Sequence, residues 1–305
     1  METFNVHILG CGCALPTLKH NPSSQVVEIR GKFFMVDCGE GTQVQLRKTH
    51  IHFSKLQAVL ISHMHGDHCF GLFGLISTFG LLGRTSPLHV YAPADYHDLF
   101  TRQLKYFCNS YDYEVVFHGI DTTKAGIIYE DRSLTIESIP LKHRMQCCGF
   151  LFREKPTLPH IRRDMIDFYG IPVSQINNVK NGADYVCEDG TVVDNSRLVV
   201  PSDKPRAYAY CSDTAYLPEL HKQLEGVTTL YHEATYTSEY EDKAQKYNHS
   251  TAEQAAMVAQ AAGAKTLLIG HYSSKYNDET VLLDEAKVIF PNTRLTDEGM
   301  VIAVE

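Results

Sequence analysis

The chain has 305 residues, nine cysteines and a formal net charge of −8. Its length suits a single large α/β domain with one insertion, and its acidic balance disfavours a general nucleic-acid coat protein, which is usually basic. No apolar run approaches the roughly 18 residues of a membrane helix, and the N-terminus lacks a basic region followed by a long apolar stretch. We therefore expect no membrane span and no signal peptide. The adjacent Cys147 and Cys148 suit reduced thiols, and so a cytoplasmic protein.

Short β-rich runs alternate with segments of helical periodicity along most of the chain. The β-rich runs are residues 4–9, 24–29, 32–37, 57–62, 88–92, 133–140, 206–212, 228–233 and 265–271. The helical segments are residues 42–49, 94–107, 217–226 and 251–262. This alternation predicts a layered α/β architecture. We expect the last helix to be capped by Ser250, with Glu253 three residues on, and to stop at Gly263.

Three histidines and an aspartate crowd the stretch VLISHMHGDH, residues 59–68, directly after an apolar run of strand length. His63 and His65 are two positions apart, so in an extended segment their side chains share one face. Asp67 and His68 follow in a turn where Gly66 is expected to permit an unusual backbone. A single histidine at a strand end is usually a packed or surface residue. Four donors at this spacing instead indicate a metal site, which in its tetrahedral form needs about four ligands.

Further candidate ligands stand after other β-rich runs: His143 after LTIESIP, Asp213 after AYAYC and His271 after TLLIG. In α/β sheets, ligands gather at the carboxyl ends of strands. These candidates together exceed one tetrahedral site and suit two metals that share a carboxylate, the arrangement of two-metal hydrolysis. We predict a first metal held by His63, His65 and His143, a second held by Asp67, His68 and His271, and Asp213 bridging them.

The HxHxDH run resembles the signature of the metallo-β-lactamase superfamily. The resemblance implies an αβ/βα sandwich with a dinuclear site at one edge. The superfamily is chemically broad, and it includes phosphodiesterases, thioesterases, lactamases and diiron oxygen reductases. Two branches fit poorly, because diiron members typically carry glutamate at the place of His65 and many lactamases lack the equivalent of His68.

Three further stretches narrow the resemblance: VDCGEGTQVQLRK (residues 36–48), HEAT (residues 232–235) and HST (residues 249–251). With the opening ILGCGCALPTLKHNPSS, they are similar to motifs of the ribonuclease Z family. The resemblance implies a hydrolase of the endonuclease class that removes the 3′ trailer from precursor tRNA. It implies a 3′-hydroxyl on the tRNA and a 5′-phosphate on the trailer. It also implies a homodimer with two Zn²⁺ per subunit, although His/Asp sites accept Mn²⁺ or Fe²⁺ with similar geometry.

The HEAT and HST stretches carry a candidate proton donor. His249 precedes the expected cap Ser250, at the positive end of a helix, where the dipole disfavours an imidazolium. Glu233 can compensate that charge, so a His249–Glu233 pair can protonate the leaving 3′-oxygen as a general acid. Asp67 is expected to hold the second metal and to accept a proton from the attacking water. Without the resemblance His249 would be an ordinary helix-start residue, and His232 is expected to be structural.

Other stretches are expected to play supporting roles. Asp37 is expected to order a ligating histidine, because such ligands usually need a partner on the outer nitrogen. Cys11 and Cys13 are expected to serve a turn and packing. Residues 72–84 predict a buried helix, with a partner interface as the alternative. Arg84 can meet a phosphate, but nothing in the sequence places it there.

Residues 153–195 differ in composition from the rest of the chain, with prolines, asparagines and glycines and little apolar periodicity. Between residues 153 and 180 there are five Lys/Arg against three Asp/Glu, so the segment is slightly basic within an acidic chain. We predict a flexible, protruding arm inserted into a single domain spanning residues 1–305; a surface insertion without a role is the alternative. Members of the family commonly carry a Gly-Pro-rich element here that grips tRNA, whereas this chain has Gly170 and Pro172 without a Gly-Pro dipeptide. The arm residues expected to contact tRNA are Arg162, Arg163 and Lys180.

Two rival functions remain open from the sequence. One is a dinuclear hydrolase of small phosphodiesters or thioesters, although a thiolate leaving group would not need the His249–Glu233 pair. The other is an RNA-binding protein with structural metals. Structural zinc sites are closed, whereas seven ligands on two metals leave open positions. Chelation separates the two, because it would unfold a protein with structural metals but only inactivate an enzyme.

Overall fold

The structure is a computed structural model that describes residues 2–49, 51–108 and 111–305. It divides the chain into two compact units. The larger unit comprises Glu2–Arg153 and Arg206–Glu305, and the insert unit comprises Glu154–Pro205. The insert unit therefore extends further along the chain than the segment 153–195 that composition marks.

The larger unit contains a first seven-stranded sheet with the order β18-β1-β2-β3-β4-β5-β6. Strands β3 to β6 are parallel, while β1, β2 and β18 pair antiparallel. The carboxyl ends of β3 to β6 therefore meet at one edge. The strands are β1 (Phe4–Gly10), β2 (Ser24–Ile29), β3 (Lys32–Val36), β4 (Leu56–Leu60), β5 (Leu88–Pro93), β6 (Val115–Ile120) and β18 (Val301–Ala303).

A second seven-stranded sheet has the order β17-β16-β15-β14-β9-β8-β7. Strands β14 to β17 are parallel, and β9 runs antiparallel to β14. The parallel strands bring four carboxyl ends side by side. The strands are β7 (Gly126–Glu130), β8 (Leu134–Pro140), β9 (Cys148–Glu154), β14 (Ala207–Cys211), β15 (Thr229–Glu233), β16 (Thr266–Gly270) and β17 (Thr293–Leu295).

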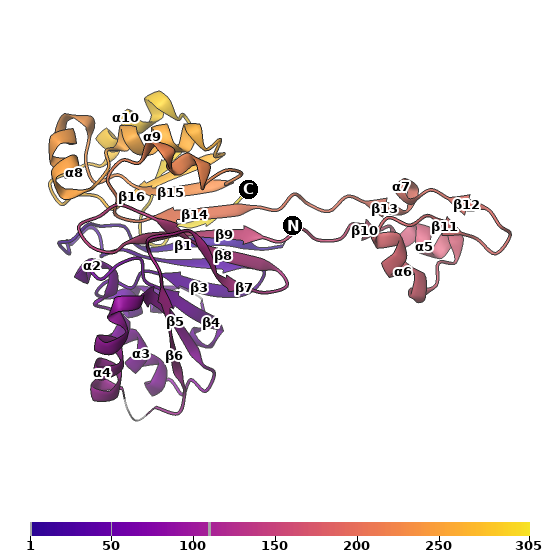
Figure 1. Ribbon diagram of the computed structural model, residues 1–305, viewed down its shortest axis with the longest axis horizontal. Helices are drawn as coiled ribbons and strands as arrows, with labels where there is room; N and C mark the ends of the chain where they lie inside the picture. The colour runs from indigo at the N-terminus through magenta and orange to yellow at the C-terminus, as the bar shows by residue number, and fades with distance from the viewer. Residues whose placement is uncertain (1, 50, 109–110) are drawn as a thin grey trace. The chain divides into compact units, whose positions relative to one another are not determined.

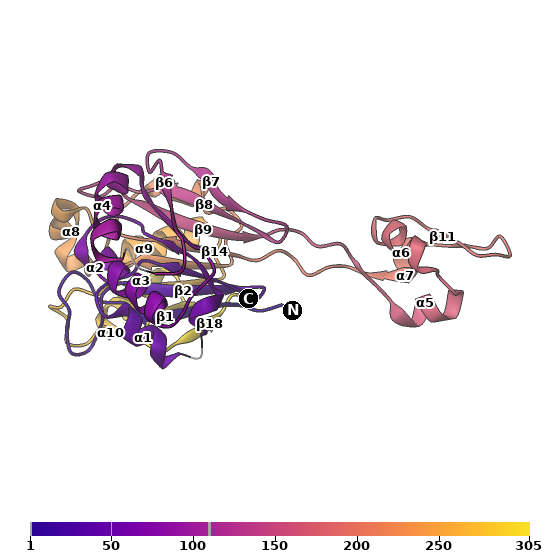
Figure 2. The ribbon, with the colours of Figure 1, turned by 90° about the horizontal axis from the view of Figure 1, so that it is seen from below.

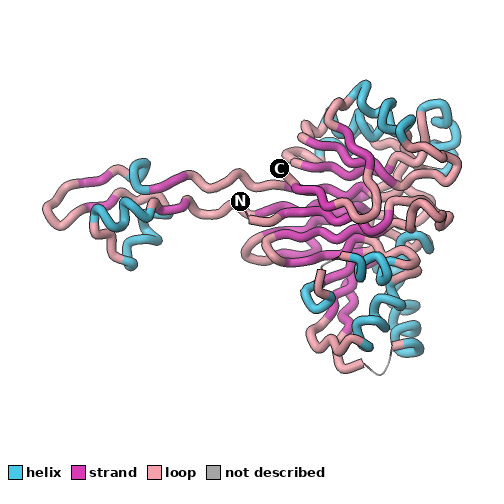
Figure 3. Tube along the Cα trace, turned by 180° about the vertical axis from the view of Figure 1, so that it is seen from behind, coloured by secondary structure: helices cyan, strands magenta, loops and turns pink. Residues whose placement is uncertain are grey.

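Alternating side chains of β3 show how the layers form. Phe34 and Val36 belong to the core that also contains Tyr208 of the second sheet. Phe33 and Met35 point to the other face and join a second core with helix residues such as Leu75. Successive side chains on a strand leave opposite faces, so a strand that is apolar at every position must be covered on both sides. The result is the predicted helix–sheet–sheet–helix sandwich (Figures 1 and 3).

The helices cover the outer faces of the two sheets. Helix α1 contacts β1 and α3, and helix α9 contacts β15 and β16. Residues 217–226, predicted to be helical, form only a 3₁₀ turn at Pro218–Lys222. None of the helices in the described ranges is long and apolar enough to cross a membrane. The α-helices described in the larger unit are α1 (Thr42–Lys48), α2 (Gly66–Cys69), α3 (Leu72–Leu81), α4 (His97–Phe107), α8 (Glu241–Tyr247), α9 (Ala252–Ala261) and α10 (Thr280–Ile289).

The start of α9 differs from the prediction by one residue. Thr251, not Ser250, is the N-cap: its hydroxyl accepts a hydrogen bond from the backbone N–H of Gln254, whose side chain accepts one from the backbone N–H of Thr251. The Ser250 hydroxyl is occupied elsewhere, since it donates to the carbonyl of Thr214. The predicted stop is confirmed, because Gly263 takes the left-handed conformation with φ +65°.

The insert unit has a small core of its own, formed by Ile171, Val179, Val193 and Leu198. Gly170, at φ +63°, ends its first helix and Pro172 precedes the second. Two short antiparallel pairs accompany the helices. The elements are β10 (His160–Ile161), α5 (Arg163–Tyr169), α6 (Val173–Lys180), β11 (Tyr185–Val186), β12 (Val192–Val193), α7 (Asn195–Leu198) and β13 (Val199–Val200).

Candidate metal centre

The predicted ligands leave the carboxyl ends of strands in both sheets. His63 follows β4, and His143 follows β8. Asp213 follows β14 and His271 follows β16, on either side of β15 in the parallel part of the second sheet. The remaining predicted ligands lie at or within the short helix α2, namely His65, Asp67 and His68.

Gly66 serves α2 through its size. It is not among the residues with positive φ, contrary to the expectation of an unusual backbone. A Cβ atom at this position would lie 2.4 Å from the exposed ring of Phe70, which would have to turn away to make room. The glycine therefore lets the ring pack against the turn that carries the ligands.

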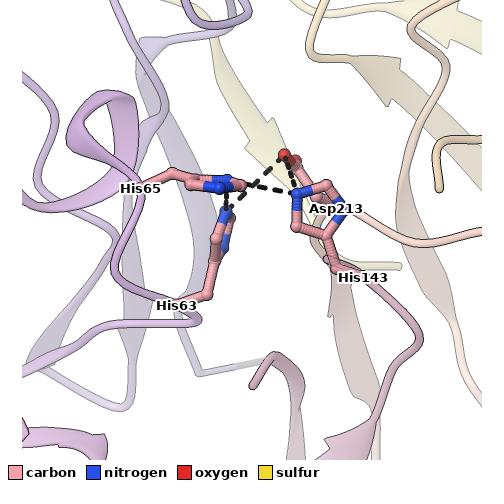
Figure 4. A group of neighbouring side chains, drawn as sticks. All are labelled: His63, His65, His143 and Asp213. Atoms are coloured by element: carbon pink, nitrogen blue, oxygen red, sulfur yellow. Dashed lines mark hydrogen bonds and ion pairs between the residues drawn. The ribbon is translucent and has the colours of Figure 1, made fainter. Parts of the chain in front are cut away.

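Four ligand atoms converge in a first group, which Figure 4 shows. His65 Nδ1 lies 3.0 Å from His63 Nε2 and 3.1 Å from His143 Nε2. Asp213 Oδ2 lies 3.6 Å from His63 Nε2 and 3.7 Å from His143 Nε2. Three ring nitrogens and one carboxylate oxygen thus face a common point, as the ligands of a single cation do.

A second group lies on the other side of Asp213. The Oδ1 atom of Asp213 is 3.1 Å from His271 Nε2 and 3.4 Å from His68 Nε2. Asp67 Oδ2 is 3.4 Å from each of the same two nitrogens. The two oxygens of Asp213 therefore face different groups, and the carboxylate joins them.

Hydrogen bonds to the outer ring nitrogens orient the histidines. His68 Nδ1 lies 2.7 Å from Asp37 Oδ2, so the expected role of Asp37 is confirmed. His143 Nδ1 donates to the carbonyl of Asn248 at 2.9 Å. A ring that donates from its outer nitrogen presents a lone pair at the inner one, which is the form that binds metal.

The backbone of His271 is in a strained conformation. Its φ is +63°, a value that L-residues with bulky side chains rarely adopt, and its Nδ1 lies 2.9 Å from Thr235 Oγ1. Asp37 also has a positive φ of 55°. Each such conformation costs on the order of 1–3 kcal/mol and persists where the surroundings fix it, commonly at functional sites.

The donor set fits divalent cations. Asp213 Oδ1 is buried and accepts no hydrogen bond from the described residues, and the nearest positive groups are the ring nitrogens of His271 and His68, which are themselves predicted ligands. Burial, helped by the neighbouring His68, lowers the pKa of His63 well below its usual range, which keeps this imidazole neutral and able to coordinate. Burial also acts to lower the pKa of His68, but Asp213, Asp37 and Asp67 outweigh it and raise that pKa well above the usual value. The same negative field attracts cations.

His249 and Glu233 form a buried pair beside the second group. His249 Nδ1 lies 3.0 Å from Glu233 Oε1. Burial alone would lower the pKa of His249, but Glu233 outweighs it and raises that pKa. Glu233 also accepts hydrogen bonds from the backbone N–H groups of Thr214, Thr235 and Ser250. Burial alone would raise the pKa of Glu233, but the neighbouring His249 outweighs it and lowers that pKa. His249 lies two residues before the helix cap, one position further away than predicted.

A hollow of about 180 Å³ opens onto the two groups. Sequence reasoning missed three of its features. Cys13, assigned to a turn, has its Sγ atom grouped with Asp67 and His271. The backbone N–H of Ala14 donates to Asp67 Oδ2 at 2.7 Å, and exposed Arg144 lines the rim. No motif marks these residues, because the loop that follows β1 approaches the site only in the folded chain.

Other predicted residues lie outside this hollow. The Arg84 guanidinium is buried and donates to the carbonyls of Phe53, Leu56, Ser86 and Pro87, so it is not placed to meet a phosphate. His232 is buried, with Nδ1 donating to the Glu233 carbonyl. The three arm residues lie in the insert unit: Arg162 pairs with Asp164, Arg163 is exposed, and Lys180 ends α6.

The fold and the paired His/Asp groups define a protein of the metallo-β-lactamase fold. A solved structure of this class, the metallo-beta-lactamase fold protein YhfI from Bacillus subtilis, matches with a TM-score of 0.69 at 18% identity over 99% of this chain and 100% of that one. The human tRNase Z, short form, matches with a TM-score of 0.71 at 23% identity over 99% of both chains.

Sequence comparison places the chain more narrowly. A protein named Ribonuclease Z from Phocaeicola vulgatus is 57% identical over 305 residues, covering 100% of this chain and 99% of that relative. The chain belongs to the ribonuclease Z family. The family model described as Anti-Pycsar protein Apyc1 also matches residues 4–159, the part that carries the HxHxDH run and His143 but not Asp213, His249 or His271.

Proposed function

We propose that the chain is a metal-dependent endoribonuclease that removes the 3′ trailer from precursor tRNA. The observation that carries the proposal is the His249–Glu233 pair beside two His/Asp groups that share Asp213. Breaking a phosphodiester at an alkoxide leaving group needs a proton donor, and this pair supplies one next to the place where the phosphate would lie. The names of the full-length relatives support the same substrate class.

The residues of the chain divide the work of hydrolysis between them. His249, protonated through its contact with Glu233, donates from Nε2 to the leaving 3′-oxygen. Asp67 accepts the proton of the attacking water, on the opposite side of the phosphorus atom. Two bound divalent cations would stabilise the charge that develops on the phosphate and lower the pKa of the water. The products are a tRNA with a 3′-hydroxyl and a trailer with a 5′-phosphate.

The proposed cofactor is two Zn²⁺ per chain. His63, His65 and His143 would hold the first, and Asp67, His68 and His271 the second, with Asp213 between them. Imidazole and carboxylate donors suit zinc, and they also accept Mn²⁺ or Fe²⁺. Elemental analysis of protein purified without added metal would identify the ions.

The insert unit is proposed to be an arm that contacts tRNA. Arg163 is exposed, and the half-buried Lys180 stands in the last turn of α6. Arg162 is already paired with Asp164 and would have to exchange that partner. Replacing Arg163 and Lys180 by alanine should weaken binding of precursor tRNA and reduce its salt dependence.

We also propose a homodimer, located in the cytoplasm. Helices α3 and α4 end in exposed apolar side chains, among them Leu81, Leu82, Tyr106 and Phe107. Because α3 and α4 contact each other, these exposed apolar side chains are the candidate dimer surface. All nine cysteines are free thiols, as expected in a reducing compartment. Light scattering of the purified protein would test the dimer.

The decisive experiment is cleavage of a 3′-extended precursor tRNA by metal-loaded protein. We expect one cut directly after the discriminator nucleotide, with 3′-hydroxyl and 5′-phosphate ends identified by mass spectrometry. An intact precursor, together with turnover of a small phosphodiester or a thioester, would leave the metal centre in place and overturn the substrate assignment.

A further inference from the structure

Cations cover two tyrosine rings close to the His249–Glu233 pair. The Arg144 guanidinium and the Lys246 ammonium each lie 5.5 Å from the ring centre of Tyr247. Lys243 lies 5.3 Å from the ring centre of Tyr236. We name Arg144, Tyr236, Lys243, Lys246 and Tyr247 the Tyr247 surface.

The Tyr247 surface is continuous with the metal centre. Arg144 follows the ligand His143 and lines the hollow. Tyr236 packs edge-on against the His249 ring, with centroids 6.2 Å apart. Helix α8, which carries both lysines, lies at the same end of the larger unit as α2, with its ligands, in both ribbon views (Figures 1 and 2).

The three cations have no carboxylate partner. Across the described residues, no Asp or Glu oxygen lies within ion-pairing distance of Arg144, Lys243 or Lys246, and all three side chains are exposed. The acidic residues of α8, Glu241 and Asp242, lie in its first turn, whereas Lys246 lies in the last turn, nearest His249. In a chain of net charge −8, Arg144 at the hollow and two lysines on the neighbouring tyrosine rings together mark a local anion site.

Tyr236 is buried, but the Tyr247 ring gives this anion site a second property. Single-stranded nucleic acid is bound by grooves that combine cations for the phosphates with aromatic rings for the bases. Tyr247 is half-buried and therefore held in place, yet part of its ring remains accessible. A double-stranded RNA would offer phosphates but no unstacked base to such a ring.

We propose that the Tyr247 surface binds the single-stranded 3′ end of the tRNA, on the 5′ side of the scissile phosphate. This proposal rests on the proposed function. The side follows from the chemistry: the phosphate stays on the trailer, so the leaving 3′-oxygen that His249 protonates belongs to the tRNA. The surface that extends outward from His249 therefore lies along the tRNA, and the trailer leaves on the other side.

Binding of fluorescent RNA to the metal-loaded full chain tests the proposal. The substrates are a 3′-extended precursor and the mature tRNA ending at the discriminator nucleotide. We expect Arg144→Ala with Lys246→Ala to weaken the binding of both RNAs about tenfold and to reduce the slope of log affinity against log salt by about 1.4, since each contact to a single strand contributes about 0.7. The matched control is Lys265→Ala with Lys287→Ala, two exposed lysines elsewhere on the larger unit.

A tyrosine series separates stacking from charge. Tyr247→Ala should weaken the binding of both RNAs about tenfold, whereas Tyr247→Phe should bind as the parent does, because the ring is kept. An unchanged salt slope in the double variant would show that the Tyr247 surface does not bind phosphates and would overturn the proposal. Weaker binding of the precursor alone would show that the surface contacts the trailer and not the tRNA. Equal metal content and equal circular dichroism in every variant exclude a folding defect. Failure of the parent protein to cut the precursor would instead contradict the proposed function.

Discussion

The Nδ1 atom of His249 lies 3.0 Å from Oε1 of Glu233, and both side chains are buried. This contact uses the nitrogen that faces away from the hollow and leaves Nε2 as the one able to give a proton to a substrate. A histidine at an open site would lose its proton near its ordinary pKa of about 6.5. The fixed carboxylate keeps the proton on His249 at higher pH.

Replacing His249 by alanine should lower kcat for precursor tRNA by about 10²- to 10⁴-fold, the usual contribution of a general acid. The loss should be much smaller for an aryl phosphodiester, because a nitrophenolate leaves without being protonated. Steady-state rates on the two substrates measure the difference. Equal losses on both would mean that His249 organises the site and does not donate the proton.

Replacing Glu233 by glutamine should move the pH profile of cleavage. As the proposed general acid, His249 must be protonated to act, so activity should be lost as pH rises through its raised pKa. Without the carboxylate that pKa falls, because burial then dominates, and the descending limb should shift to lower pH. The control is Glu225→Gln, at an exposed position. A profile that only drops in height, with its descending limb in place, would contradict the role of Glu233.

The same substitution should also destabilise the fold. Glu233 accepts from three backbone N–H groups and from the Thr235 hydroxyl. In glutamine an NH2 group replaces one of the carboxylate oxygens, so it meets N–H or O–H groups that need an acceptor. This mismatch should lower the unfolding free energy by about 1–3 kcal/mol. Urea denaturation at a pH where His249 is uncharged isolates this cost. An unchanged midpoint there would show that the pocket reorganises around the amide.

Much of the metal centre follows from the sequence because its residues obey a local rule. HxHxDH occupies one turn, and His143, Asp213 and His271 each follow a recognisable strand. Parallel pairing then brings the strand ends together. Cys13, Ala14 and Arg144 obey no such rule, because tertiary folding alone brings their loops to the site.

Two of the missed helices have little buried apolar surface, whereas β9 and α10 were missed although both contribute buried residues. Helix α8 buries only Ala244, and α5 in the insert unit has no buried residue, so neither shows an amphipathic period. The one-residue error at α9 has a tertiary cause. Ser250 and Thr251 are equally good caps by sequence, and the contact of Ser250 with Thr214 decides between them.

Replacing Asp213 by asparagine should empty both metal positions. Its two oxygens face different groups of histidines, Oδ2 the first and Oδ1 the second. Elemental analysis should find well below one ion per chain, against two for the parent. His143→Asn is the comparison, because it removes a donor from the first group alone. Retention of one ion in the Asp213 variant would mean that the carboxylate serves a single metal.

Replacing Arg84 by lysine should destabilise the protein without changing its affinity for tRNA. The guanidinium satisfies four backbone carbonyls from a buried position, and a lysine ammonium has only three donors at a single point. We expect a loss of about 2–4 kcal/mol in unfolding free energy, from several charge-assisted hydrogen bonds broken together. The salt dependence of precursor binding should be unchanged in the folded variant. A reduced salt slope would show that Arg84 contacts a phosphate. We do not expect that result, because the guanidinium is buried and its donors are already bonded to backbone carbonyls.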